Sequence, residues 1–154
     1  MERNARCVWI DGLRFDTFSH NGKMIRMDGW KDHELEEAGP TPGELIPMAL
    51  GTCTGMDVVF IAGKQRMELD GLEVEVIATA TDEHPKTYTS FEVVYHIRGS
   101  DLDIDKLERA IALSRDKYCM VGNTLGQCMS IGHSYTVNGG EVRSVPESGE
   151  EPES

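Results

Sequence analysis

The cysteines are the residues of this chain whose chemistry most needs an explanation. There are four, and none forms a Cys-x-x-Cys pair or has a histidine at zinc-ligand spacing, so a structural zinc site is not expected. A disulfide scaffold is not expected in a cytosolic chain of this length. Each thiol is therefore either inert and buried or reactive. We expect the first kind for Cys7 and Cys128, at a strand or helix end, and examine Cys53 and Cys119 for the second.

Cys53 lies in the run PTPGELIPMALGTCTGMDVVFIAG, which predicts a helix ending near Arg66. Apolar residues at helical spacing share its face and predict that this face is buried: Ile46, Ala49, Leu50, Met56 and Phe60. By this pattern alone, Cys53 is a packing residue. Gly51 and Gly55 beside it indicate close approach by another helix, a partner subunit or a substrate, because glycine weakens a helix by up to about 1 kcal/mol.

Cys119 lies in DKYCMVGNTLG, where a second helical pattern ends. Backbone N–H groups at such a break can favour the thiolate. Asp57, one turn beyond Cys53, is interpreted as an N–H acceptor or a helix-packing group; a carboxylate so near Cys53 would raise the pKa of that thiol unless it is paired.

The elements that must position these thiols follow from the hydrophobic periodicity. Two alternating segments joined at SHNG predict a hairpin before the first helix, and a polar loop, WKDHELEEAG, follows them. Two further strands, a second helix and a last strand come after the first helix. The predicted order is β-β-(β)-α-β-β-α-β, an α+β domain with antiparallel sheets packed on two main helices.

The start of the first helix carries its own signal. Thr41, Pro42 and Glu44 fit the cap, first position and third position of a capping box. Pro47 would kink a helix already under way, so the start can also lie later. Glu44 is nine positions before Cys53 and on the opposite face of a straight helix, so it is either a capping residue or a group that serves another subunit's site.

Composition and charge limit the classes of function. The net charge of −12 argues against nucleic-acid binding, and no long uncharged apolar run predicts a membrane span. The N-terminus has no apolar export signal, so we expect a cytoplasmic protein. We expect one domain over residues 1–140 and an acidic, disordered tail over 141–154.

Two motifs together resemble the OsmC/Ohr family of thiol peroxidases. The first is PTPGELIPMALGTCTGMDVV, in which five residues match the family pattern: Pro42, Glu44, Leu45, Ala49 and Cys53. The second is KYCMVGNTL, in which the matching residues are Lys117, Tyr118, Cys119, Val121 and Leu125. HSYTV, with His133, is similar to the same branch, and the resemblance covers about residues 4–138.

The resemblance implies an OsmC-like fold and an intertwined homodimer with two active sites at the subunit boundary. It implies that Cys53 attacks an organic hydroperoxide or hydrogen peroxide, and that Cys119 condenses with the resulting sulfenic acid to a disulfide. A dithiol reductant, of lipoyl type in better-known members, would reopen the disulfide. No cofactor or metal is implied.

The family uses an arginine to activate the thiol and to orient the peroxide. Arg26 lies where the OsmC-type arginine would align, and Arg14 suits the Ohr-type position; each arginine can also be an ordinary strand residue. Glu44 is a candidate for activating a thiol as well as a capping residue. Two functions therefore stay open. One is a peroxidase whose apolar surroundings at Cys53 favour alkyl hydroperoxides; the other is a non-enzymatic redox sensor or binder of small apolar ligands.

Overall fold

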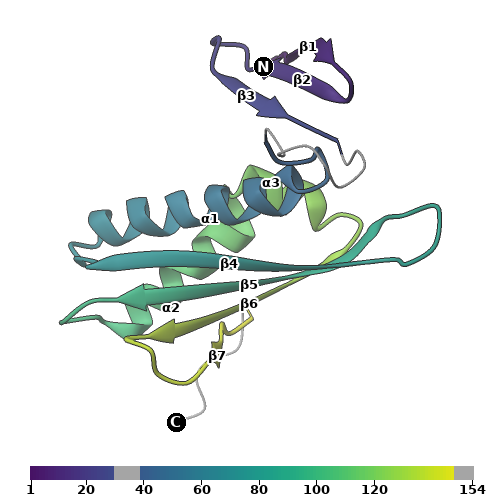
Figure 1. Cartoon of the computed structure of the whole chain (residues 1–154). Coiled ribbons are helices and arrows are strands. Elements are labelled where there is room, and N and C mark those ends of the chain that lie inside the picture. Colours follow the sequence, from purple (N-terminus) through teal and green to yellow (C-terminus); the bar gives the residue numbers. More distant parts are fainter. Residues whose placement is uncertain (30–38, 148–154) are drawn as a thin grey trace. The chain divides into compact units, whose positions relative to one another are not determined.

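The structure is a computed structural model that describes residues 1–29 and 39–147 of the chain (Figure 1). Contacts within the chain divide it into two units, Met1–Ile46 and Pro47–Ser154. We describe each unit by itself. The predicted polar loop at residues 30–39 lies almost wholly outside the described residues.

The N-terminal unit is a three-stranded antiparallel sheet in the order β1-β2-β3, with strands Arg6–Asp11, Arg14–Phe18 and Met24–Met27. A tight turn at Gly12, whose φ of 47° favours glycine, joins the first two strands. The predicted hairpin turn at SHNG is confirmed, since the Ser19 N–H bonds to the Lys23 carbonyl at 2.9 Å. None of the residues described in this unit is buried.

The C-terminal unit packs helices on a four-stranded sheet of order β4-β5-β6-β7 (Figure 1). The strands are Gly71–Ala80, Tyr88–Arg98, Ser130–Val137 and Arg143–Ser144. The helices are α1 (Leu45–Lys64), α2 (Ile104–Leu113), the π-helix η1 (Ser114–Tyr118) and α3 (Met120–Leu125). The α+β class predicted from the sequence is confirmed.

One feature of the sheet differs from the prediction. We expected antiparallel pairing throughout, but β5 and β6 pair in parallel, from Ser90 with Ser130 to Ile97 with Val137. The segment between these strands contains α2, η1 and α3, and such a crossover is long enough to return the chain in the same direction.

The start of α1 settles the alternative that Pro47 left open. The helix begins at Leu45, so Pro47 lies in its first turn, where a missing N–H costs little. Glu44 precedes it and accepts hydrogen bonds from the Thr41 N–H at 2.7 Å and hydroxyl at 2.8 Å. One half of the predicted capping box is therefore present, and the helix ends at Lys64, two residues before the expected end.

The buried face of α1 is not the one predicted from the apolar spacing. Of the five apolar residues assigned to the face of Cys53, only Leu50 is buried, and Met56 and Phe60 are 68% and 66% exposed. The buried face instead carries Gly51 and Gly55. A Cβ on Gly51 would lie 2.9 Å from the Val76 side chain of β4, so the expected close approach is that of a strand. Cys53 is at the edge of this face and half-buried.

By length and composition α1 would also pass as a membrane-spanning helix. Its small-residue face nevertheless packs on β4, and Leu50 and Val58 belong to the central core. We interpret α1 as the core helix of a small soluble domain.

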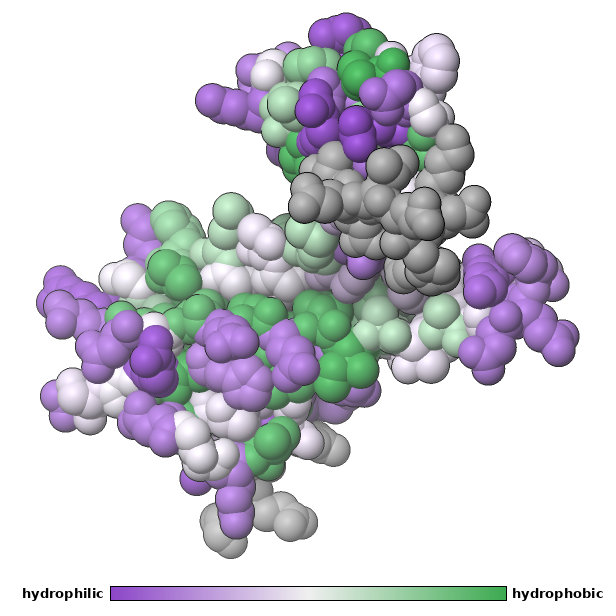
Figure 2. Space-filling view, viewed as in Figure 1, coloured by the Kyte–Doolittle hydropathy of each residue, from purple (hydrophilic) through white to green (hydrophobic). Residues whose placement is uncertain are grey.

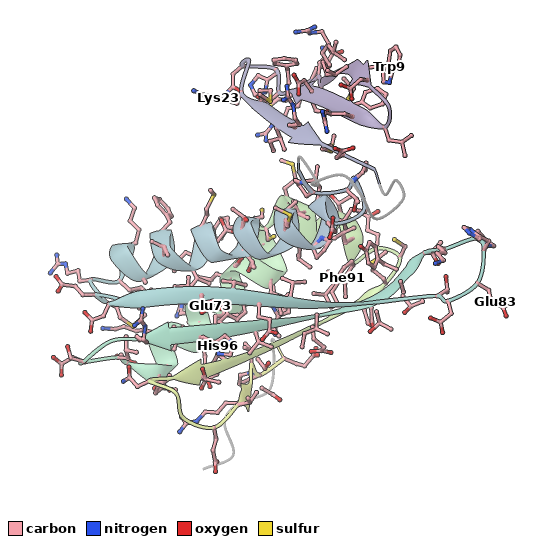
Figure 3. All side chains as sticks on the ribbon, viewed as in Figure 1. Trp9, Lys23, Glu73, Glu83, Phe91 and His96 are labelled. Atoms are coloured by element: carbon pink, nitrogen blue, oxygen red, sulfur yellow. The ribbon has the colours of Figure 1, made fainter. Side chains whose placement is uncertain are left out.

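The sheet has a buried face and an exposed face. On β5 the residues Phe91, Val93, Tyr95 and Ile97 alternate inward and are at most 1% exposed. Figure 3 shows the side chains along the strands, with Glu73 of β4 and its cross-strand partner His96 of β5 labelled. The core therefore lies between α1, α2 and the inner side of the sheet.

Two minor predictions are wrong. The tail was expected to begin at residue 141, but β7 pairs with β6, and Val145, which is 7% exposed, joins the core, so residues 141–147 belong to the described fold. Cys7 and Cys128 were expected to be buried, and both are exposed. Neither the apolar character of cysteine nor a position at a strand or helix end predicted correctly whether these two side chains are buried.

Candidate functional site

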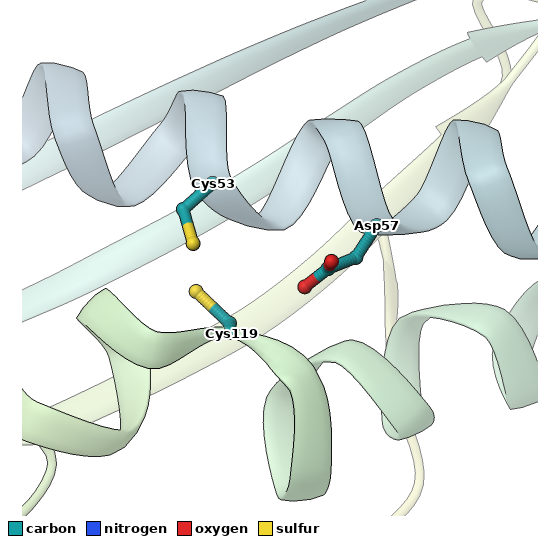
Figure 4. Close-up of side chains that lie close together, drawn as sticks. All are labelled: Cys53, Asp57 and Cys119. Carbon is teal, nitrogen blue, oxygen red and sulfur yellow. The ribbon is translucent and has the colours of Figure 1, made fainter. Parts of the chain in front are cut away.

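The structure brings two of the four cysteines together. The Sγ atoms of Cys53 and Cys119 and a carboxylate oxygen of Asp57 all lie within 4.8 Å of one another. Figure 4 shows the two sulfurs pointing at each other from α1 and from the start of α3, with the Asp57 carboxylate directed toward the pair. Cys53 is half-buried, whereas Cys119 is 1% exposed.

A π-helical turn places Cys119. The Cys119 N–H bonds to the Ser114 carbonyl at 2.9 Å, which closes a five-residue turn at the end of α2. The backbone then becomes extended, and Cys119 caps α3 by accepting a hydrogen bond from the Gly122 N–H at 3.2 Å. The predicted break in the helix thus delivers the thiol to a backbone N–H, as the sequence indicated.

The protonation of Cys119 nevertheless runs against the prediction. Burial raises the pKa of the Cys119 thiol to about 12, because desolvation disfavours the thiolate. The hydrogen bond with Cys53, the charge of Cys53 and the charge of Asp57 raise this pKa further, and the Gly122 N–H opposes them without prevailing. Cys119 is therefore a protonated thiol at neutral pH.

A chain of buried hydroxyl groups runs from Asp57 through the core. Asp57 accepts a hydrogen bond from the Ser114 hydroxyl at 2.9 Å, and this hydroxyl lies 2.9 Å from that of Thr54. The Thr54 hydroxyl lies 2.6 Å from the Tyr95 hydroxyl, which lies 3.0 Å from Nδ1 of His133. Ser114, Thr54 and Tyr95 are each 0% exposed.

The far end of this chain reaches a pocket of about 450 Å³. His133, Cys119 and Arg115 are among its lining residues. Burial lowers the pKa of His133 to about 4, and the charge of Arg115 lowers it further, so its imidazole is neutral at pH 7. The Arg115 guanidinium is held by Asp116 at 2.6 Å and by the Pro146 carbonyl at 3.0 Å.

A second pocket, of about 720 Å³, begins at Asp57 and extends along α1 and α2. Its apolar lining includes Phe60, Ile61 and Leu113, and three cationic side chains border it: Lys64, Lys106 and Arg109. Figure 2 shows apolar side chains gathered over the α1 and β4 region of the viewed face. One pocket thus contains Cys119, and the other begins at Asp57, the carboxylate beside the thiol pair.

The two sulfurs and the Asp57 carboxylate are also a donor set that a metal ion could use. Two observations favour thiol chemistry instead. Asp57 already accepts a hydrogen bond from Ser114, and the raised pKa of Cys119 disfavours the thiolate that a metal requires. We therefore assign no metal to these groups.

The other residues assigned by the resemblance lie in the N-terminal unit. Arg26 of β3 forms an ion pair with its cross-strand partner Asp16, with contacts of 2.6 and 2.8 Å. Arg14 contacts Asp28 at 3.1 Å, and Glu44 holds Thr41. Each has a partner within its own unit, and their roles at the thiols stay predictions.

Sequence reasoning missed most of the polar groups around the thiols. Thr54, Ser114, Tyr95 and Arg115 come from three separate elements and show no common motif. The usable signal was their position, since Thr54 adjoins one cysteine and Ser114 and Arg115 lie one helical turn before the other. Asp57 was expected to be an N–H acceptor or a packing group beside Cys53; it instead accepts a hydrogen bond from the Ser114 hydroxyl, and its charge raises the pKa of Cys119.

Comparisons with known proteins agree with this architecture. A family model described as OsmC-like protein matches residues 33–134. The chain is 35% identical over 133 residues to Protein YhfA of Escherichia coli K12, covering 86% of this chain and 96% of the relative.

Solved structures show the same fold. A hypothetical protein from Aquifex aeolicus VF5 has a TM-score of 0.77 and 26% identity, covering 92% of this chain and 99% of that one. The organic hydroperoxide resistance protein OhrB of Bacillus subtilis has a TM-score of 0.58 at 15% identity, covering 90% and 98%, which shows likeness of fold alone. With its paired thiols in place, a family model matched across about two thirds of its length and a relative 35% identical over 133 residues, the chain belongs to the OsmC-like protein family.

Proposed function

We propose that this protein is a thiol-dependent peroxidase that reduces organic hydroperoxides, or hydrogen peroxide, through Cys53 and Cys119. The observation that carries the proposal is the asymmetry of the pair. Two sulfurs lie within 4.8 Å, one half-buried and one fully buried. Such a pair suits an attacking thiol that meets peroxide and a resolving thiol that waits beside it.

The proposed cycle has three steps. The Cys53 thiolate attacks the distal peroxide oxygen, the O–O bond breaks, and the alkoxide takes a proton to leave as alcohol, which gives the Cys53 sulfenic acid. Cys119 then attacks the Cys53 sulfur, so that an S–S bond forms, the S–O bond breaks and water leaves. A dithiol reductant finally attacks the disulfide, returns two thiols and is itself oxidised to a disulfide.

Relatives of the same fold support the substrate class. OhrB of Bacillus subtilis is named an organic hydroperoxide resistance protein. The pocket beside Asp57 has apolar residues such as Phe60 and Leu113, which suit an alkyl chain better than a small polar peroxide. Arg26 and Glu44 stay candidates for thiol activation, but each is engaged by a partner within its own unit, so the proposed cycle does not depend on them.

We also propose that the protein is a homodimer. Its support is apolar surface that the single chain leaves uncovered: Met56, Val59 and Phe60 of α1 are between 53% and 68% exposed. Side chains of this size in one helix face are typical of an interface. Sedimentation velocity at micromolar protein should give a dimer mass, and a monomer at all concentrations would refute this part.

The test of the activity is direct oxidation of the reduced protein. One equivalent of cumene hydroperoxide should be consumed, and mass spectrometry should find a Cys53–Cys119 disulfide. In Cys119→Ser a Cys53 sulfenic acid should accumulate and be trapped by dimedone, while Cys128→Ser, which changes an exposed thiol, should behave as the unaltered protein. Peroxide that persists while both thiols stay reduced would refute the proposal.

The ion pairs of the N-terminal arginines support a second candidate function. Because Arg26 and Arg14 are both engaged by carboxylates, neither is poised as a free cation for peroxide. A redox sensor or a binder of small apolar ligands, with negligible turnover, would not need a free cation beside the thiol. The pocket of about 720 Å³ is large enough for such a ligand. A single oxidation without recycling by dithiol reductants would favour this function.

A further inference from the structure

We propose that Asp57 is the proton-transfer group of the resolving thiol Cys119, and that the buried chain Ser114–Thr54–Tyr95–His133 connects this carboxylate to the pocket beside His133 as a proton relay. The proposal rests on the peroxidase function for its biological use. The relay itself is carried by four consecutive hydrogen bonds of the structure.

The hydrogen bonds of this chain have only one consistent direction. A carboxylate only accepts, so the single hydroxyl hydrogen of Ser114 goes to Asp57. Thr54 must then donate to Ser114, which leaves Tyr95 to donate to Thr54.

This direction fixes the tautomer of the histidine. The Tyr95 oxygen has its own hydrogen committed to Thr54, so it accepts from His133, and Nδ1 of the neutral imidazole must carry the hydrogen. All donors therefore point toward Asp57. Nε2 of His133 is left as an acceptor that can take a proton from water in the pocket.

The environment of these hydrogen-bonded hydroxyls indicates a role beyond packing. Three hydroxyls that are 0% exposed replace apolar groups in a core otherwise built of residues such as Leu50, Phe91 and Val93. Burying such groups is costly unless every one is bonded, and here every one is. The chain also joins two partly exposed titratable groups, Asp57 beside the sulfurs and His133 at the pocket.

The resolving step requires such a group. Cys119 keeps its proton at neutral pH, whereas only a thiolate attacks sulfur effectively. Asp57, within 4.8 Å of both sulfurs, takes the proton from Cys119 as its sulfur attacks Cys53. The S–S bond forms, the S–O bond of the sulfenic acid breaks, and Asp57 returns the proton to the leaving hydroxide as water.

Reduction of the disulfide needs the relay. The reductant's thiolate attacks Cys53, the S–S bond breaks and Cys119 leaves as a buried thiolate that must take one proton. Each donor passes its hydrogen one step toward Asp57 and on to Cys119, while His133 takes a proton from pocket water at Nε2. The pocket water that gives this proton leaves as hydroxide, and one proton arrives at the sulfur, so charge balances. The hydroxyls then rotate back and His133 returns to its Nδ1–H tautomer.

The charged groups that face this path come from several elements. Cys53 of α1 and Cys119 of α3's cap face Asp57. Arg115 and Asp116 of η1 act on His133, and Arg115 acts on Tyr95. Glu147 lines the pocket and acts on Arg115. Burial, together with the Arg115 charge at the pocket end, keeps His133 neutral, the state that the relay requires.

The test measures disulfide closure separately from the first oxidation. Reduced protein is mixed with one equivalent of cumene hydroperoxide and quenched over time with dimedone, so that Cys53 sulfenic acid and disulfide are counted by mass spectrometry. In Asp57→Asn the rate of disulfide closure, measured separately from the rate of sulfenic acid formation, should fall at least about tenfold, within the range for general acid–base groups. Asp101→Asn, a matched exposed carboxylate, should change neither rate.

The pH profile separates proton transfer from a structural effect. In Asp57→Asn the closure rate should rise about tenfold per pH unit, because solvent hydroxide must then ionise Cys119, whereas the unaltered protein should show a much shallower rise. Tyr95→Phe keeps the ring in the core but cuts the chain, and should slow disulfide reduction by a dithiol several-fold without slowing closure as much. Tyr95→Phe also tests the relay if Asp57→Asn does not fold.

The same variants are tested with diamide, whose adduct on Cys53 is displaced by Cys119 without any peroxide. If peroxide leaves both thiols reduced, the proposed peroxidase fails, and the diamide rates still decide the relay. If Asp57→Asn and Tyr95→Phe match the unaltered protein with both oxidants, with the same pH profile, the relay is overturned.

Discussion

The two units of this protein differ in how far they bury their apolar side chains. The C-terminal unit buries Phe91, Tyr95 and Leu107 completely between sheet and helices. The N-terminal sheet has no buried residue among those described, and its Trp9 and Ile25 are 63% and 52% exposed. A three-stranded sheet needs an apolar face covered to be stable. The comparison teaches that the C-terminal unit contains its own core and the paired thiols, whereas the N-terminal sheet leaves its apolar side chains exposed.

The largest expected effect concerns the thiols of the two units. Cys53→Ser should abolish peroxide consumption, a loss of at least about 100-fold, because the attacking sulfur is removed. Cys7→Ser, in the N-terminal sheet and exposed, should leave it unchanged. Stopped-flow peroxide consumption measures both, and an equal loss in the two variants would break the assignment of the chemistry to the C-terminal unit.

Truncation of one phenylalanine in each unit tests the difference in burial. Phe91→Ala, at 0% exposure, should lower the free energy of unfolding by about 3–5 kcal/mol. Phe15→Ala, at 36% exposure, should cost less than about 1 kcal/mol if the sheet stays uncovered. Urea unfolding at several protein concentrations checks this. A large, concentration-dependent loss in Phe15→Ala would instead show that a dimer covers the N-terminal sheet.

The pH dependence of stability should come from the C-terminal unit. The folded pKa of His133 is lowered to about 4, so the unfolded chain binds its proton first and stability falls as the pH drops from about 6.5 toward 4. At about 1.4 kcal/mol per pKa unit, and allowing for partial exposure, this loss is roughly 2 kcal/mol. Urea unfolding of His133→Gln should lack this loss.

The opposite sign applies to Cys119. Its folded pKa is raised to about 12, so its contribution is complete below the unfolded pKa and is lost as the pH rises toward 12. Cys119→Ser should therefore unfold with a flatter alkaline dependence than the unaltered protein. An unchanged alkaline slope would contradict the burial of this thiol as a neutral group.

The smallest effects compare the cations of the two units. Arg115→Gln should slow Cys53 oxidation several-fold, because Arg115 lines the pocket at Cys119. Arg26→Gln should change it by less than about twofold, since Arg26 is engaged by Asp16 at the protein surface. A tenfold or greater loss in Arg26→Gln would show that the N-terminal unit contributes to the site, as the resemblance implies.

The sequence determined the order of elements and the candidate pair of thiols. Periodicity at two and at 3.6 residues depends on local geometry, so the strands before β7, α1 and the helical break at Cys119 were predictable. Motif spacing indicated Cys53 and Cys119 together, and the family model supports the resemblance on which this depended.

Only the tertiary structure decided the environment of the thiols. Which face of α1 is buried depends on how closely Gly51 and Gly55 let β4 approach, and this cannot be read from one helix. The pKa of Cys119 depends on desolvation by distant segments, which outweighs the local N–H of Gly122. The chain from Asp57 to His133 joins α1, η1, β5 and β6, so its residues meet only when those elements pack.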